Sequence, residues 1–249
     1  MPARRYLALI VFVLFCLTGC QTTTSTSTTS GSSTSTTSTS TTSSTLPGTN
    51  IAFKGSINKR QSETGRADFY GEVQNKGTTT VGYVKVHITM KNASREVLGT
   101  NYSHIDGTVR RVSSNTNSCL RPGDTGAFYV GSSINYSDVA SFESWIDWDT
   151  YATFAPSASF EVVGSITQGS NAAGDRKYSG QAKNKSATNA TFVRLIFISK
   201  DSAGKVIDDS AAYVTGTDVR SGETRSFIVQ TSTATTEIAS YYYLFDWSE

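Results

Sequence analysis

The chain contains few of the side chains from which catalytic and metal centres are built. Its 249 residues include two histidines, His87 and His104, and three cysteines. Zinc sites use cysteine, histidine and carboxylate ligands at short, regular spacings, and neither histidine has such neighbours in the sequence. A glycine-rich phosphate loop and a serine in a nucleophile elbow are also missing. We therefore predict no catalytic residue, no cofactor, no metal ion and no enzymatic activity.

An excess of positive charge is missing as well. The chain has 22 basic and 20 acidic residues, and two of the basic ones, Arg4 and Arg5, lie in a segment that we expect to be removed. Surfaces that bind nucleic acid need a basic surplus or a basic patch. The mature chain is formally neutral, so we predict no nucleic-acid partner.

The N-terminus has the order of a secretory signal. Arg4 and Arg5 precede eleven consecutive apolar residues, from Leu7 to Leu17, and small residues follow. A helix needs about 20 apolar residues to span a bilayer, so this run is too short to be a membrane anchor. Residues 1–19 are therefore predicted to be a signal peptide.

The end of this signal resembles the bacterial lipobox in its residues Leu17-Thr18-Gly19-Cys20. The resemblance implies cleavage before Cys20 and attachment of lipid to this cysteine, which would hold the protein on a membrane. Gln21, rather than aspartate, follows. In bacteria with two membranes this implies the outer membrane, and otherwise the outer face of the cell membrane. The alternative is an ordinary signal peptide with a chance cysteine.

Residues 20–49 are predicted to be the lipidated N-terminus and a disordered linker. Positions 22–45 are all serine or threonine apart from Gly31. Such a segment has no apolar side chains whose burial could offset the entropy of ordering. It would act as a stalk, and O-linked sugars on it are left open.

The remainder of the chain repeats itself. A shift of 109 pairs residues 51–108 with 160–217, and a shift of 99 pairs residues 119–148 with 218–247. Identical residues are spread over the whole alignment, which is typical of a duplicated unit; they include Gly71 and Gly180, Asn75 and Asn184, and Trp148 and Trp247. The sequence thus predicts two domains, residues 50–150 and 151–249.

Each copy has the pattern of strands. Between residues 83 and 90 apolar and polar side chains alternate, the period of a half-buried strand. Comparable stretches lie near residues 51–57, 67–75, 81–91, 96–105, 126–132 and 141–148, with counterparts in the second copy. The predicted fold is all-β, with two tandem immunoglobulin-like β-sandwich domains.

Three segments resemble the FxLYD-type immunoglobulin-like domains of bacterial and archaeal envelope proteins. They are Phe197 to Asp201, with the turn to Val206 that follows, Leu120 to Thr125, and Gly180 to Lys185. The resemblance implies an envelope protein without catalytic residues.

Aspartate and tryptophan end both copies, as Asp147-Trp148 and Asp246-Trp247. Paired carboxylates beside aromatic rings serve glycoside chemistry. However, the same residues stand at the same register in both copies. We therefore expect each tryptophan to fill a sandwich core and each aspartate to hold a turn.

The first copy has an additional loop, residues 109–119, with Arg110, Arg111 and Cys119. Loops at the ends of sandwiches often carry binding, so these residues form a candidate interaction loop. The alternative is an insertion without a role, because loop insertions cost little. Cys119 is the free thiol that remains in the mature chain, and it could cross-link two molecules.

In the second copy Phe192, Ile196 and Ile198 occupy the strand face that is mixed in the first copy. Apolar side chains on both faces of a strand indicate that both are covered. The cover is predicted to be the first copy; a homodimer contact is the alternative.

These observations together predict a membrane-anchored lipoprotein of the cell envelope with a non-catalytic binding or structural role. Its partners would be the membrane, through the lipid, and an envelope protein or glycan. The alternatives are an outward-facing adhesin, an accessory subunit of an envelope assembly and, less favoured, an envelope hydrolase.

Overall fold

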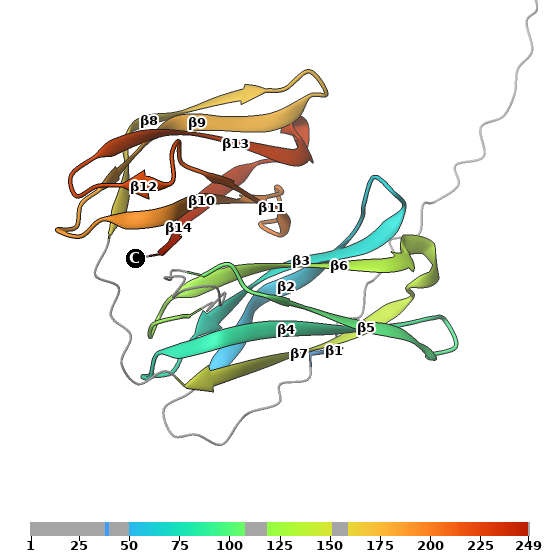
Figure 1. Cartoon of the computed structure of the whole chain (residues 1–249). Helices are drawn as coiled ribbons and strands as arrows, with labels where there is room; N and C mark the ends of the chain where they lie inside the picture. The colour runs from blue at the N-terminus through green and yellow to red at the C-terminus, as the bar shows by residue number, and fades with distance from the viewer. Residues whose placement is uncertain (1–37, 40–49, 108–118, 151–158, 249) are drawn as a thin grey trace, which may run out of the picture. The chain divides into compact units, whose positions relative to one another are not determined.

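The computed structural model describes residues 38–39, 50–107, 119–150 and 159–248 (Figure 1). In this part of the chain the regular elements are β-strands and two 3-10 turns, η1 (Tyr136–Asp138) and η2 (Thr235–Glu237). The predicted all-β fold is confirmed. Within the same ranges no helix has the length and apolar character needed to cross a bilayer.

The first half of the described chain consists of two sheets (Figure 1). One has the antiparallel order β2-β3-β6, with β2 at Ile51–Gln61, β3 at Arg66–Asn75 and β6 at Thr125–Asn135. The other has the order β1-β7-β4-β5, with β1 at Ser38–Thr39, β7 at Ser141–Thr150, β4 at Val81–Lys91 and β5 at Val97–His104.

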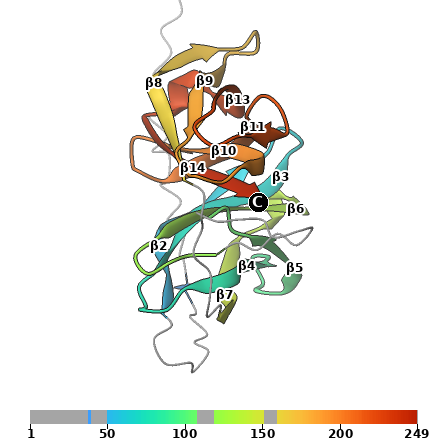
Figure 2. The same ribbon diagram turned by 60° about the vertical axis from the view of Figure 1, so that its left-hand side comes forward.

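The second half repeats this arrangement (Figures 1 and 2). One sheet has the order β8-β9-β13, with β8 at Phe160–Ser170, β9 at Asp175–Asn184 and β13 at Thr224–Ala234. In the other, β10 (Ala190–Lys200) pairs with β11 (Val206–Tyr213), β14 (Ser240–Ser248) and the short β12 (Asp218–Val219).

Irregularities of the backbone in the first half recur in the second half, 109 residues further along the chain. The β2–β3 register shifts between Lys54 and Asn58, and the β8–β9 register shifts 109 residues later. A second irregularity places Tyr83 in β4 at φ 50° and Phe192 in β10 at φ 48°. Bulges redirect a strand and its side chains, so the repeat seen in the sequence extends to the hydrogen-bond register. The immunoglobulin-like class of the two halves stays a prediction.

Each half encloses its own hydrophobic core. Alternation along β4 buries Val84, Val86, Ile88 and Met90 completely. In the second half the core includes Tyr178, whose ring stacks on that of Phe197 with centroids 4.1 Å apart. Trp148 and Trp247 belong to the two cores, so their predicted role as core residues is confirmed.

The same close packing appears twice around a glycine. A Cβ atom on Gly71 would lie 2.5 Å from Cζ of Phe128, and one on Gly180 would lie 2.8 Å from Cζ of Phe227. Both distances are too short for carbon atoms that are not bonded. The two identical glycines in the sequence therefore make room for a phenylalanine ring on the neighbouring strand.

The linker prediction needs one correction. Ser38 and Thr39 form a short strand that pairs in parallel with Glu143 and Ser144 of β7. β7 is otherwise an edge strand, and the free backbone groups of an edge accept an additional strand. The remainder of the predicted signal peptide and linker lies outside the described residues.

The predicted domain boundary falls between β7 and β8, where residues 151–158 are outside the description. The division into independent domains 50–150 and 151–249 stays a prediction.

Candidate functional site between the two halves

Apolar side chains join the two halves. Ile196, Ile198 and Val206 of the second half form a buried cluster with Ala127 of β6, and Tyr70 of β3 packs against it. The prediction that the first copy covers Ile196 and Ile198 is therefore confirmed.

The same prediction is wrong for Phe192, whose side chain is 51% exposed. Phe192 lies in the irregular part of β10, where pairing with β14 shifts between Thr191 and Arg194. The positive φ of Phe192 breaks the alternation of side chains along the strand. Its side chain is therefore exposed, whereas those of Ile196 and Ile198 are buried.

Glu72 is the centre of the polar contacts between the halves. Its side chain is buried in β3 and accepts hydrogen bonds from Lys200 Nζ at 2.7 Å and from the Tyr242 hydroxyl at 2.8 Å. Charge-assisted hydrogen bonds are stronger than neutral ones. This contact therefore fixes how β3 lies against β10 and β14.

A guanidinium group makes a second polar contact. Arg194 of β10 donates to Asp106 of the first half at 3.0 Å and also to Asp246 of β14. Its charge is therefore committed to two carboxylates.

Asp209 of β11 lies next to this group, beside the carboxyl group of Asp106. It stands opposite Ile198 in the β10–β11 register and so faces the first half. Both of its carboxyl oxygens are buried, and Asp209 shares a hydrogen bond with the carboxyl group of Asp106. Burial raises the pKa of Asp209 well above its ordinary value, and the negative charges of Asp106 and Asp208 add to this effect. Asp209 therefore tends to hold a proton.

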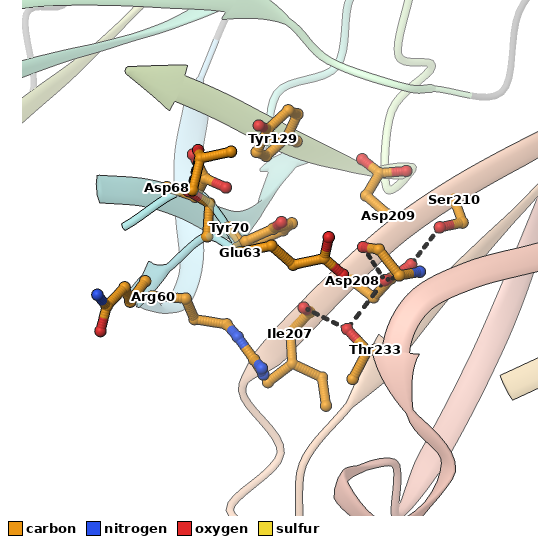
Figure 3. Close-up of a pocket in the computed structure, with 14 residues that line it drawn as sticks. Arg60, Glu63, Asp68, Tyr70, Tyr129, Ile207, Asp208, Asp209, Ser210 and Thr233 are labelled. Atoms are coloured by element: carbon orange, nitrogen blue, oxygen red, sulfur yellow. Dashed lines mark hydrogen bonds between the residues drawn. The ribbon is translucent and has the colours of Figure 1, made fainter. Parts of the chain in front are cut away.

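A pocket of about 340 Å³ opens beside Asp209 (Figure 3). Its first wall comes from the end of β2, the following turn, β3 and β6, and its second wall comes from β11 and β13. The side chains that decide its chemistry are Arg60, Glu63, Asp68, Tyr70, Tyr129, Asp208 and Asp209. Carboxyl groups thus line both walls.

Neutral groups hold the carboxylate of Asp208. The hydroxyls of Ser210 and Thr233 donate to it, the latter at 2.9 Å, and the backbone N–H of Ser232 donates at 3.2 Å (Figure 3). These donors fix its position without neutralising its charge. Asp208 is 1% exposed, so its carboxylate forms part of the wall and not of the open space of the pocket.

The opposite wall combines an acid with two aromatic rings. Burial raises the pKa of Asp68, while a hydrogen bond with Tyr129 acts in the other direction. The rings of Tyr70 and Tyr129 lie 5.0 Å apart. The pKa of Tyr70 is raised by burial first and then by the negative charge of Asp68. The pocket is therefore acidic and partly aromatic.

The residues predicted from the sequence lie elsewhere. Cys20, Arg110 and Arg111 fall outside the described residues, so the lipidation site and most of the interaction loop stay predictions. Cys119 is described, and only 1% of it is exposed. Burial raises the pKa of its thiol to about 11. Because thiolate is the reactive form, this argues against a cross-link through Cys119.

The prediction that each aspartate of the repeated pair holds a turn is wrong. Both aspartates stand within strands. Asp147 is exposed in β7, opposite Lys85 of β4. Asp246 occupies the same place in β14, where it is bonded to Arg194. Their surroundings differ because Asp246 lies on the face of β14 that packs against the first half, whereas Asp147 lies on an exposed face of β7.

The two histidines lie on the outer face of β4 and β5. The ring of His87 stacks on Trp145 at 4.7 Å and lies 5.4 Å from the ring of Tyr102. Burial lowers the pKa of His87 and of His104. In the described ranges no three histidine, cysteine or carboxylate side chains form a group that could hold a metal ion.

Reasoning from the sequence missed the acidic pocket. Its walls come from residues 60–129 and residues 207–233, so no local motif marks them. A signal was nevertheless present in the repeat, where Asp68 corresponds to Lys177, Glu72 to Gln181 and Asp209 to Thr100. Positions at which one copy carries an acidic residue and the other does not were the signal that could have indicated the pocket.

Comparisons with known proteins add little to this geometry. No protein-family model and no curated protein matches the chain. A crystal structure of red sea bream transglutaminase is similar at 9% identity, with a TM-score of 0.22. The match covers 82% of this chain and 32% of the transglutaminase, so the chain spans about a third of that protein's length. A match this distant carries no argument about function.

Proposed function

We propose that this protein is a lipid-anchored, non-catalytic binding protein of the bacterial cell envelope, which captures a ligand between two immunoglobulin-like halves. The observation that carries the proposal is the pocket of about 340 Å³ with walls from both halves. Ligand sites occur preferentially at interfaces between domains, and this volume lies within their usual range.

The interface between the halves supports this proposal because it fixes both walls. Ile196 and Ile198 pack on the first half through apolar contacts, and Glu72 and Arg194 add charged contacts. A binding site that is held in place before the ligand arrives loses less entropy on binding.

The lipobox supports the anchored location. Lipid on Cys20 would hold the chain on the outer membrane, or on the outer face of a single membrane. Because Ser38 and Thr39 pair with β7, the serine- and threonine-rich segment before them would let the two halves move about 20 to 25 Å from the anchor, by the scaling of flexible chains.

Two experiments test the two parts of the proposal. For the anchor, cells that produce the full chain are fractionated with and without globomycin. We expect the protein in the membrane fraction, an uncut precursor after globomycin, and failed processing of Cys20→Ala. Unchanged processing of this variant would contradict the anchor.

For binding, the purified full chain is heated in detergent with a panel of cationic, anionic and neutral small molecules. A ligand of the folded state raises the melting temperature. We expect at least one class to raise it in a saturable way. No shift with any class would contradict a binding function.

A further inference from the structure

We propose that Asp106 and Asp209 form a pH-dependent latch between the two halves. The latch holds while their carboxyl groups share one proton, and it weakens when both groups are ionised. This inference goes beyond the proposed function, because it concerns the docking of the halves and holds with or without a ligand. It depends on the place of the two groups, on the proton that they need and on the charges around them.

The two carboxyl groups come from opposite halves and meet beside the apolar cluster. Asp106 exchanges two backbone hydrogen bonds with Ala127 of β6, at 2.8 and 2.9 Å. Ala127 belongs with Ile198 of β10 to the buried cluster between the halves. Ile198 in turn stands opposite Asp209 in the β10–β11 register. Each half thus brings one carboxyl group to the same place.

A direct contact between these two groups requires a proton. An ionised carboxylate only accepts hydrogen bonds, whereas a protonated carboxyl group also donates one. Asp106 and Asp209 share a hydrogen bond, and both oxygens of Asp209 are buried. Burial first, and then the charges of Asp106 and Asp208, raise the pKa of Asp209. In the docked state the pair therefore holds one proton between two acids, as close carboxylates do elsewhere.

Charged groups from β3, β10, β11 and β14 stand around the pair. They are the carboxylates of Glu72, Asp208 and Asp246 and the guanidinium of Arg194. Arg194 favours the ionised form of Asp209, but it already donates to Asp106 and Asp246. The charge of Glu72 is matched by Lys200. Ionisation of Asp209 therefore adds a negative charge to a group that already contains more carboxylates than cations.

The neutral groups around the pair keep their protons over the same range of pH. They are the hydroxyls of Tyr242 on β14, Tyr70 on β3 and Tyr129 on β6. Burial raises the pKa of each above the ordinary value of 10.0. The carboxyl pair is therefore the part of this contact whose charge changes as the pH rises from acid to mildly alkaline.

The direction of the effect follows from the proton. Separation of the halves exposes Asp209 to water and removes Asp106, so the docked state binds the proton more tightly than the separated state. Docking is strongest below the ordinary pKa of 3.8 and weakens as the pH rises through the raised pKa of the docked pair. Because one proton is released, the ratio of separated to docked molecules grows by up to about tenfold per pH unit.

The test measures the accessibility of a thiol placed in the interface. Val206→Cys is the probe, because Val206 belongs to the buried cluster and is 2% exposed. The full chain in detergent carries this substitution alone or together with Asp209→Asn. Both proteins are treated with the uncharged reagent methyl methanethiosulfonate from about pH 5 to about pH 9. Mass spectrometry of the peptides gives the rate of labelling.

Asp209→Asn mimics the protonated acid, because its amide donates a hydrogen bond to Asp106 at every pH. The ratio of the labelling rates without and with Asp209→Asn cancels the ionisation of the thiol itself. We expect this ratio to be close to one at the acidic end and to exceed about tenfold at the alkaline end. Asp106→Asn places the same donor on the other half and should also suppress the rise in labelling.

The matched control is Asp147→Asn, because Asp147 is an exposed aspartate of β7, away from the pair. We expect it to leave the pH profile of the probe unchanged. Cys119 is the internal reference for unfolding, since it is 1% exposed within the first half. Its labelling should stay slow while that of the introduced thiol rises.

Three results would overturn the inference. The first is a ratio of labelling rates that does not change with pH. The second is an equal effect of Asp147→Asn and Asp209→Asn. The third is a parallel rise in the labelling of Cys119, which would mean that the chain unfolds and that the halves do not separate as intact bodies. None of these results bears on the proposed binding function, because no ligand is present.

Discussion

The outer face of β4 in the first half and the outer face of β10 in the second half are the same surface in two copies. At positions 109 residues apart, His87 corresponds to Ile196 and Thr89 to Ile198. The β10 face is buried against the other half, whereas the histidine of the β4 face stacks between aromatic rings. The comparison teaches that a few different residues on the outside of a strand make one copy of the face polar and the other an interface, while both copies keep a buried core on the inner side.

The partner face shows the complementary difference. β3 of the first half presents Tyr70 and Glu72 to the interface, and the equivalent positions of β9 are Ser179 and Gln181. Gln181 is exposed. Each half therefore contributes a different one of its two sheets, and this asymmetric pairing places the acidic pocket between unlike walls.

The largest effect is expected when each of the equivalent residues Ile198 and Thr89 is replaced by the other, because the two substitutions should change the free energy of unfolding by very different amounts. Ile198→Thr places a hydroxyl in a buried apolar cluster, and we expect it to lower the free energy of unfolding by about 2 to 4 kcal/mol. Thr89→Ile changes the outer face of β4 and should stay within about 0.5 kcal/mol of the original chain. Urea denaturation measures both, and similar losses in the two variants would contradict the assignment of one face as an interface.

The second exchange concerns Glu72 and its counterpart Gln181. Glu72→Gln keeps the shape but removes the charge that meets Lys200, so we expect a loss of about 1 to 3 kcal/mol. Gln181→Glu at its exposed position should have little effect. Melting curves at low and high salt would sharpen the result, because a buried pair is screened less than an exposed one.

The pH dependence of stability should report on Asp209, which has Thr100 as its counterpart. Burial raises its pKa in the folded state, so the folded protein binds this proton more tightly than the unfolded chain does. Its stabilising contribution is complete below the unfolded pKa of about 3.8 and is lost as the pH rises through the folded pKa.

Asp209→Asn cannot ionise and should not show this loss. We expect the variant to be more stable than the original chain at pH 8, by about 1 kcal/mol, because an ionised Asp209 is buried beside the negative charges of Asp106 and Asp208. The difference should shrink as the pH falls towards 4. Thermal unfolding across this range measures it, and parallel curves for both proteins would refute a buried Asp209 with a raised pKa.

Local features of the fold were predictable from the sequence, and distant ones were not. The strands near residues 81–91 and 141–148 were found because alternation of side chains is a local signal. The burial of Trp148 followed from its repetition as Trp247. The covered face at Ile196 and Ile198 was predicted because it is apolar where its copy is polar.

What was missed depends on long-range geometry. The exposure of Phe192 follows from a strand irregularity that residue types alone do not reveal. The pairing of Ser38 and Thr39 with β7 depends on a free strand edge. The contact of Glu72 with Lys200 joins residues 128 positions apart and follows only from the docking of the two halves.

The most direct test of this docking is zero-length cross-linking with a carbodiimide, followed by mass spectrometry of the peptides. Such a reagent joins a lysine and a carboxylate that are in contact. Lys200 and Glu72 lie 2.7 Å apart across the two halves, and Lys91 and Glu143 lie 2.6 Å apart within the first half. We predict both cross-links in the full chain and loss of the first alone in Lys200→Arg. Recovery of the Lys91–Glu143 link without the Lys200–Glu72 link would contradict the pairing of the two halves.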